Sequence, residues 1–193
     1  MANLIAPHGG KGLTCCLLEG AELEQEQKKA EGLKKITISP REEGDLIMMG
    51  IGGFSPLTGF MTKADWKGVC DNYLMADGTF WPIPVTLSAD KADADGIADG
   101  EEIALVTEGG EILATMKVTE KFEMTEADKK YECEKVFMGE GTPTADEFWK
   151  IAKDDHPGVQ MVMDQKEFNF AGPVKVLTEA EYPTKYAGIY QRP

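Results

Sequence analysis

Few residues in this sequence have the types and spacing that chemistry requires. His8 and His156 could act as general bases or metal ligands, but each lies in a turn rich in glycine or proline, where an imidazole commonly bonds a nearby backbone group. The run from Gly9 to Gly12 could cradle a phosphate, yet it neither follows a strong strand nor carries the Gly-Lys-Ser/Thr of a phosphate-binding loop. We therefore interpret both histidines and the glycine run as structural.

One acidic stretch imitates a calcium-binding loop of the EF-hand type. Asp93 and Asp95 occupy its third and fifth positions, Gly96 the sixth and Glu102 the twelfth. The first position should be an aspartate, but it is Lys91, and the last six residues run into a predicted strand. We therefore expect an exposed acidic connection here and no calcium site.

None of the four cysteines belongs to a Cys-x-x-Cys pair: they are Cys15, Cys16, Cys70 and Cys133. Metal ligation by Cys70 or Cys133 together with His8 or His156 would have to be assembled from separate segments, and nothing in the spacing indicates it. We expect four buried, free thiols and no metal.

Length and charge narrow the class of protein. A chain of 193 residues is long enough for one sizeable domain. Its formal charge of -14 argues against a nucleic-acid or anionic-membrane surface, because phosphate binding depends on clustered Lys and Arg. No apolar run approaches the ~20 residues that span a bilayer, and the start lacks the regions of a signal peptide. We expect a cytoplasmic protein.

The first part of the chain alternates short strands with capped helices. Residues 13–18 and 35–38 are consistent with strands, and residues 21–35 between them form either an exposed helix or a mobile arm. Ser39 begins a capping box that predicts a helix over residues 40–49. Thr62 begins another, and apolar residues at helical spacing predict an amphipathic helix that the turn Asp77-Gly78 ends.

From residue 80 onwards the pattern indicates mainly β-strands. The strands that we expect are residues 80–88, 103–107, 112–118, 159–163 and 174–177. The second and third of these strands form a hairpin, and the pair Gly172-Pro173 leads into the last strand. Capping signals at Thr125 and Thr144 begin two further helices, and the turn at residues 156–158 stops the second of these. Residues 181–193 are irregular and carry no anchor of their own.

The loop at residues 52–61 is too apolar for a simple connection. It is dense in glycine and proline, yet it carries Phe54, Leu57 and Phe60, which water would reject, so we expect an ordered loop pinned into the core. Gly52 and Gly53 could offer backbone donors to an anion, but the packing of Phe54 explains them as well. The prolines of residues 81–88 indicate that the chain enters its next strand at a sheet edge or bulge.

These two stretches also carry a family resemblance. The ordered matches are APHGG at residues 6–10, GGFSPLTGFM at 52–61, WPIPVTLS at 81–88, GEEIAL at 100–105, and HPGV at 156–159 with GPV at 172–174. Together they resemble the N-terminal domain of sulfate adenylyltransferase (ATP sulfurylase). The resemblance extends from Ala6 to about Leu177, and the run from Gly52 to Phe60 is its most specific part.

The resemblance implies a fold and a division of the chain. It implies an α+β fold, a PUA-like β-pseudobarrel with peripheral helices, over residues 1–180. Residues 181–193 would begin the linker to an absent catalytic domain; Gln191-Arg192-Pro193 resembles that linker and not the catalytic motif. In this family catalysis belongs to a second domain with Gln-x-Arg-Asn-Pro, His-x-x-His and Gly-Arg-Asp motifs, and none of the three is present here.

The same resemblance implies a function for the whole enzyme. It would form adenosine 5'-phosphosulfate and pyrophosphate from ATP and sulfate with magnesium. This chain would hold no catalytic, cofactor-binding or metal residue; it would support the catalytic domain of the same chain and help build a homo-oligomer. The alternatives are a free-standing PUA-like RNA-binding domain and an interaction domain of another assembly. The basic pairs Lys28-Lys29 and Lys34-Lys35 are interleaved with or flanked by glutamates, which argues against RNA.

Overall fold

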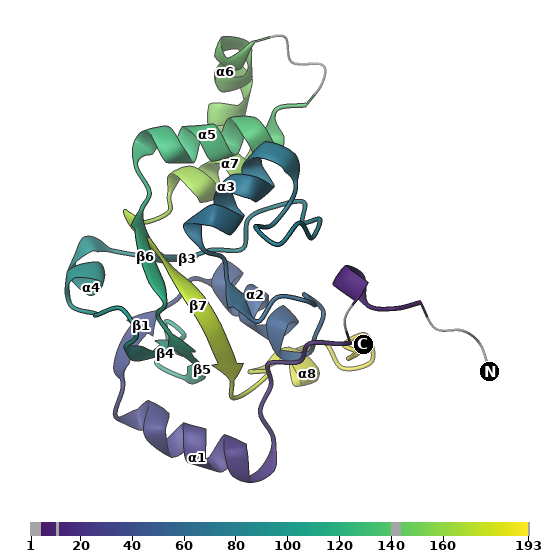
Figure 1. The fold of residues 1–193 in the computed structure, drawn as a ribbon, viewed down its shortest axis with the longest axis vertical. Coiled ribbons are helices and arrows are strands. Elements are labelled where there is room, and N and C mark those ends of the chain that lie inside the picture. Colours follow the sequence, from purple (N-terminus) through teal and green to yellow (C-terminus); the bar gives the residue numbers. More distant parts are fainter. Residues whose placement is uncertain (1–4, 11, 140–143, 193) are drawn as a thin grey trace.

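The chain folds as an α+β domain in which helices surround a curved mixed sheet that forms a half-barrel (Figure 1). The structure is a computed structural model, and it describes residues 5–10, 12–139 and 144–192. The helices are η1 (His8–Gly10), α1 (Gly20–Glu31), α2 (Pro40–Gly50), α3 (Lys63–Asn72), α4 (Lys91–Asp95), α5 (Glu126–Phe137), α6 (Ala145–Asp155), α7 (Pro157–Met163) and α8 (Tyr182–Lys185). The strands are β1 (Lys34–Thr37), β2 (Gly59–Phe60), β3 (Leu87–Ala89), β4 (Glu102–Val106), β5 (Ile112–Lys117), β6 (Glu120–Glu123) and β7 (Phe168–Val176).

Strand β7 is the centre of the sheet. The strand order is β1-β4-β5-β7-β2, and β3 and β6 also pair with β7. The pair β1 and β4 is parallel, whereas all four partners of β7 run antiparallel to it. The first half of β7 pairs with β3 and β6, and its last part pairs with β5, so that one long strand joins the two parts of the half-barrel.

Two glycines permit the crossing at the middle of β7. A Cβ at Gly172, where φ is 147°, would lie 2.0 Å from the carbonyl oxygen of Lys117, and a Cβ at Gly59 would lie 1.9 Å from the carbonyl oxygen of Gly172. Only glycine allows three backbones to approach so closely. The sequence GPV therefore lies inside the strand, whereas the pattern predicts a strand that begins only at residue 174.

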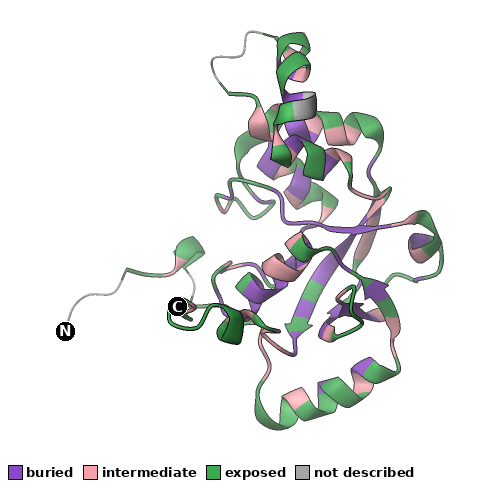
Figure 2. Cartoon of the chain, turned by 180° about the vertical axis from the view of Figure 1, so that it is seen from behind, coloured by how far each residue is buried: buried purple, intermediate pink, exposed green. Residues whose placement is uncertain are grey.

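Apolar residues form one main core and two smaller clusters. The main core lies between the half-barrel and α2, and Figure 2 shows buried residues gathered along the sheet and the inward sides of the helices. A second cluster joins α3 to β6, where the buried Trp66 donates its indole N–H to Glu132 at 2.6 Å. A third joins α5, α6 and α7 around Cys133 and Phe148. Helices α5 to α7 thus form an appendage with its own small core.

The helix starts agree with the sequence patterns. Ser39, Thr62 and Thr125 each form a capping box, and Thr144 caps α6 through the backbone N–H of Glu147. Residues 21–35 are mainly helix α1 and not a mobile arm. Helix α3, however, ends at Tyr73, which adopts a left-handed conformation, and not at the Asp77-Gly78 turn.

Several predicted strands are wrong or too long. Residues 13–18 are not a strand: they make only one isolated bridge, Leu17 to Val176. Of the strand expected over residues 80–88, only β3 forms, because the prolines before it prevent ladder pairing. Residues 159–163 are helix α7, since His156 caps a new helix directly after ending α6. Strand β6 is absent from the prediction because its sequence, EKFE, is mostly charged.

The acidic stretch is a short helix. Asp90 caps α4, and Lys91 forms an ion pair with Asp95 at 3.0 Å, which is incompatible with an EF-hand loop and agrees with the expected exposed connection. None of the helices in the described parts of the chain combines the length and the apolar character needed to cross a membrane.

Candidate functional site

The two stretches that carry the resemblance meet at a hollow of about 560 Å³ beside α2. The turn after α2 forms one wall, and the segment between α3 and β3, which loops out beside α3 in Figure 1, forms the other. Its main lining residues are His8, Arg41, Asp45, Phe54, Phe80, Trp81 and Ile83. The hollow is open and mostly apolar.

Phe54 and Trp81 form the aromatic wall of the hollow. Trp81 is 8% exposed and belongs to the main core, and Phe54 packs against this core with its ring only partly buried. The expectation that the loop is pinned into the core therefore holds for Leu57 and Phe60, which are buried, and only in part for Phe54. Ser55 secures the turn, since its hydroxyl donates to the carbonyl of Gly52 at 2.6 Å.

His8 fastens the N-terminal segment to this wall. Its Nε2 donates to the carbonyl oxygen of Phe80 at 2.6 Å, and its ring lies 6.0 Å from that of Trp81. The imidazole thus bonds a backbone group, as the sequence predicts, but one that is 72 residues away in the chain. Gly9 and Gly10 form the short turn η1, and Lys11 lies outside the described residues.

Arg41 and Asp45 form the polar part of the lining. The guanidinium donates to Asp45 at 3.1 Å and to the carbonyl oxygen of Thr86 at 3.0 Å, and it lies 3.6 Å from Glu42. Burial raises the pKa of the Asp45 carboxyl to about 6, although Arg41 acts in the opposite direction and Glu42 adds to the rise. Arg41 is therefore occupied by protein partners and tethers α2 to the strand-entry segment. Sequence reasoning missed this pair, whose signal is its i, i+4 spacing directly after Pro40.

The rim of the hollow is an exposed apolar surface. Phe80 is 54% exposed and Ile83 44%, and both stand beside the partly buried Phe54. We call this surface the aromatic face; it consists of Phe54, Phe80, Trp81, Pro82 and Ile83, with Leu13 and Met48 at its edge where they pack on Gly52 and Gly53. A contiguous apolar surface of this kind is typical of an interaction site.

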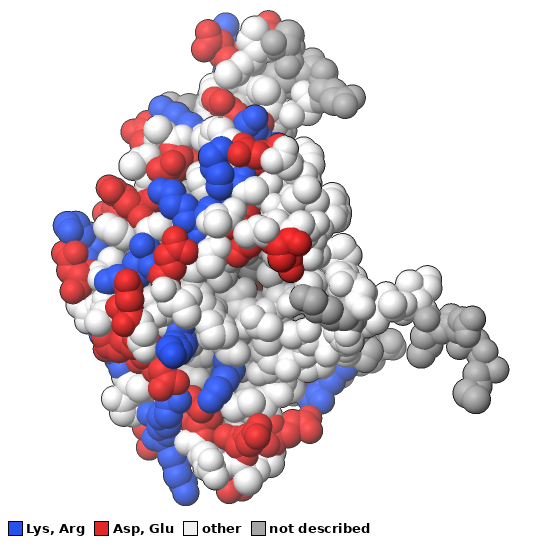
Figure 3. Space-filling model, in the orientation of Figure 1, with Lys and Arg blue, Asp and Glu red and all other residues white. Residues whose placement is uncertain are grey.

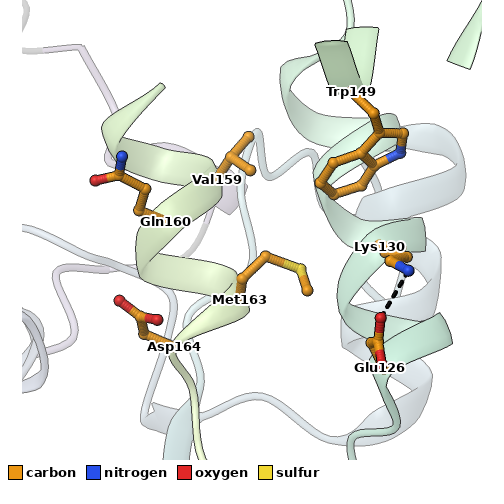
Figure 4. Close-up of a pocket in the computed structure, with 7 residues that line it drawn as sticks. All are labelled: Glu126, Lys130, Trp149, Val159, Gln160, Met163 and Asp164. Atoms are coloured by element: carbon orange, nitrogen blue, oxygen red, sulfur yellow. Dashed lines mark ion pairs between the residues drawn. The ribbon is translucent and has the colours of Figure 1, made fainter. Parts of the chain in front are cut away.

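A second hollow, of about 420 Å³, lies between α5, α6 and α7 (Figure 4). The ring of Trp149 faces Val159 and Met163 across it, while Glu126 and Lys130 on α5 form an ion pair at 2.7 Å at its edge. Lys130 lowers the pKa of Glu126. These side chains form an apolar slot whose edge carries the Glu126–Lys130 ion pair and the carboxylate of Asp164, and they assemble no nucleophile with a base.

The other residues that the sequence analysis singled out, His156 and the four cysteines, are placed as follows. His156 Nδ1 accepts the backbone N–H of Val159 at 3.3 Å and its ring packs on Phe137, in line with its structural interpretation. All four cysteines are free, and burial raises the pKa of Cys16 to about 11 and that of Cys133 to about 12. The expectation of four buried thiols is wrong for Cys15, which is exposed, and Cys16 is only partly buried, because the run 13–18 lies along the edge of the fold.

In the described part of the chain, Arg41 and Lys130, the cations that line the two hollows, are each paired with a carboxylate. Arg41 in the first hollow pairs with Asp45, and Lys130 in the second hollow pairs with Glu126. Nowhere among the described residues do three His, Cys, Asp or Glu side chains group so as to hold a metal ion. Of the basic spots, Lys29 pairs with Glu26 and Glu102. We therefore assign no step of a reaction to these side chains.

Comparison with known proteins identifies the fold. The sequence model of the PUA-like domain matches residues 5–179. This chain belongs to the PUA-like domain family. A solved structure titled "Hexameric APS kinase from Thiobacillus denitrificans" is 25% identical with a TM-score of 0.65, over 95% of this chain and 29% of that chain. The expected PUA-like α+β fold is confirmed.

Several curated relatives match over the whole chain. A sulfate adenylyltransferase of Desulfatibacillum aliphaticivorans is 77% identical over 100% of this chain, and one of Desulfovibrio desulfuricans is 64% identical over 100% of it. The matches cover only 46% and 45% of those relatives, so this chain spans about half their length. The resemblance to the N-terminal domain of sulfate adenylyltransferase is confirmed.

Proposed function

We propose that this PUA-like domain is the non-catalytic part of an enzyme that forms adenosine 5'-phosphosulfate and pyrophosphate from ATP and sulfate. The observation that carries the proposal is the identity of 77% over the whole chain with a sulfate adenylyltransferase that is about twice as long. The domain supports the other half of the enzyme, and a homo-oligomer of the whole protein belongs to the same proposal. A role in sulfate metabolism and a cytoplasmic location follow from it as predictions.

The chemistry of the reaction supports placing catalysis in the other half. Sulfate oxygen is a weak nucleophile, so the reaction needs Arg, His and Gln side chains and magnesium to orient the phosphate and neutralise its developing charge. In this domain His8 and His156 bond backbone groups, and Arg41 is held by Asp45 and Thr86. We therefore place the ATP and magnesium sites outside these residues.

The test compares the full-length protein with this domain alone. The full-length protein should exchange pyrophosphate into ATP in a sulfate-dependent manner, and the 193-residue chain should not. Omission of sulfate is the control for other ATP-consuming activities. Activity of the short chain that survives repurification would overturn the assignment of catalysis to the other half. A full-length protein without sulfate-dependent exchange would overturn the proposed enzyme.

A further inference from the structure

We propose that the aromatic face is the surface on which the remaining half of the enzyme docks. This inference rests on the proposed function and adds the place and chemistry of the contact. More than half of each sulfate adenylyltransferase relative lies outside the part that this chain matches, so a large partner within the same protein is available to cover the face.

The exposure of the face is the first observation in favour. Phe80 and Ile83 lie three residues apart on one short segment, and Met48 and Leu13 extend the apolar surface past the Gly52-Gly53 turn. Scattered apolar residues on a surface need no explanation, but these are contiguous and centred on a concave wall. Aromatic residues in a well-packed pocket are the usual energetic centre of a protein interface.

The distribution of charge is the second observation. Charged residues make up 28% of the chain, and its net charge is -14. Figure 3 shows Lys, Arg, Asp and Glu crowded on the side of α4, α5 and β1, whereas the side toward η1 carries few of them. Because this side of a strongly acidic domain carries few charges, a partner that covers it desolvates fewer charged groups than one that covers the opposite side.

The face is also held in one shape before any partner arrives. His8 fixes the carbonyl of Phe80, Arg41 fixes that of Thr86, and the backbone N–H of Trp81 donates to the carbonyl of Tyr73 at 2.8 Å. These bonds tie the N-terminal segment, α2 and the end of α3 to the same loop. Because the loop is already ordered, docking loses little conformational entropy.

The C-terminal segment lies on the same part of the fold. Tyr182 of α8 packs near Gly44 of α2, and Arg192 lines a hollow with Leu13 and Ile51 beside the Gly52-Gly53 turn. The expectation that residues 181–193 are irregular and without an anchor is wrong, because Tyr182–Lys185 forms α8 and Arg192 pairs with Glu179 at 2.5 Å and with Glu19 at 3.4 Å. The described C-terminal segment therefore lies beside the edge of the aromatic face and not on the appendage of α5 to α7.

Oxidative footprinting of the full-length protein tests the proposal without a mutation. Met48 and Met161 are both exposed in this domain, at 37% and 57%, but only Met48 borders the aromatic face. In the full-length protein, hydroxyl radicals should oxidise Met48 and Phe80 roughly fivefold more slowly than Met161, since a docked partner excludes water from its contact centre. Equal oxidation rates of Met48 and Met161, after correction for their different exposed fractions in this domain, would overturn the proposal.

Substitution gives a second, independent readout. The double variant Phe80→Ser/Ile83→Ser in the full-length enzyme should lower its melting temperature by about 4 °C or more and reduce its sulfate-dependent activity. The matched control is Ile151→Ser, which changes a 67% exposed residue on α6 and should alter neither. If the wild-type enzyme is active and the double variant has the same melting temperature and activity, the docking surface is wrong but the proposed function stands. If the wild-type protein has no sulfate-dependent activity, the proposed function itself is wrong. Concentration-dependent self-association that the double variant abolishes would assign the face to a second copy and overturn the proposal.

Discussion

The ring of Phe54 meets the indole of Trp81 edge to face, with centroids 5.6 Å apart and an interplanar angle of 84°. Such a pair adds about 1 kcal/mol to the burial of the two rings. Trp81 belongs to the core, whereas one side of Phe54 faces the open hollow. The contact therefore joins the core of the domain to the surface that we assign to docking.

Because the two rings differ in burial, alanine substitutions of Phe60 and Phe54 should differ in their cost to stability. Phe60→Ala should lower the free energy of unfolding of the 193-residue chain by roughly 3–5 kcal/mol, because this buried ring leaves a cavity. Phe54→Ala should cost less, about 1–3 kcal/mol, because its ring is only partly buried. Chemical denaturation of both variants and the wild type measures the difference. A cost for Phe54→Ala equal to that for Phe60→Ala would mean that Phe54 is a core residue and not part of the face.

Local signals in the sequence predict the helices well and the sheet less well. Capping boxes such as Ser39-Pro40-Arg41-Glu42 act within one helical turn, so their effect survives folding. The run 159–163 is apolar except for Gln160 and fits a strand or a helix equally; the cap that His156 supplies decides for the helix. The crossing at Gly172 depends on Lys117 and Gly59, which only the tertiary fold brings there.

The aromatic face could be predicted from the sequence only in part. The structure shows that Phe54 and the Trp81-Pro82 segment meet at one hollow. The sequence predicts only an ordered apolar loop at residues 52–61 and a strand entry through the prolines of residues 81–88. It does not distinguish Phe54 from Phe60, because an apolar side chain that a partner covers has the same type as one that the core covers. Arg41 and Asp45 were recognisable as a helical pair, but only the fold brings them to the hollow.

The four thiols should differ sharply in reactivity. Under native conditions near pH 8, alkylation should modify only Cys15 quickly, because it is exposed, while burial raises the pKa of Cys16 to about 11 and that of Cys133 to about 12. Relative to a thiol of ordinary pKa, the thiolate fraction, and hence the alkylation rate, should be lower by roughly a hundredfold for Cys16 and roughly a thousandfold for Cys133. Mass measurement should show one adduct in the native chain and four after denaturation without reductant. Cys15→Ser is the control and should leave the native chain unmodified; a stable disulfide would contradict the expectation.

Calcium should have no specific effect on this domain. Each of the three carboxylates that would bind calcium has another role: Asp93 pairs with Lys34 at 3.7 Å, Asp95 pairs with Lys91, and Glu102 accepts a hydrogen bond from Lys29 at 2.6 Å. Millimolar calcium should therefore change the melting temperature no more than magnesium at the same ionic strength does. A calcium-specific rise that Glu102→Gln abolishes would show that helix α4 rearranges into a binding loop.

The buried carboxylate of Glu26 fixes α1 against the sheet. It accepts hydrogen bonds from Thr115 on β5 and Lys175 on β7, each at 2.8 Å, and pairs with Lys29 at 2.6 Å. Burial alone would raise its pKa, but the bonds from Lys175, Lys29 and Thr115 outweigh burial and lower the pKa to about 2. The ionised form is thus the one that the folded state favours.

This depressed pKa predicts an acid-sensitive contribution to stability. Since the carboxyl titrates near pH 4 in the unfolded chain, its contribution is fully present above that pH and is lost as the pH falls toward 2. We expect roughly 1–2 kcal/mol, because both lysines are partly exposed and solvent screens the pair. Glu26→Gln should remove this part of the pH dependence, measured by denaturation between pH 2 and 7, while Glu24→Gln, at an exposed position of the same helix, should not. Parallel pH profiles of the wild type and Glu26→Gln would contradict the assigned role, since α1 would then be held by its apolar contacts alone.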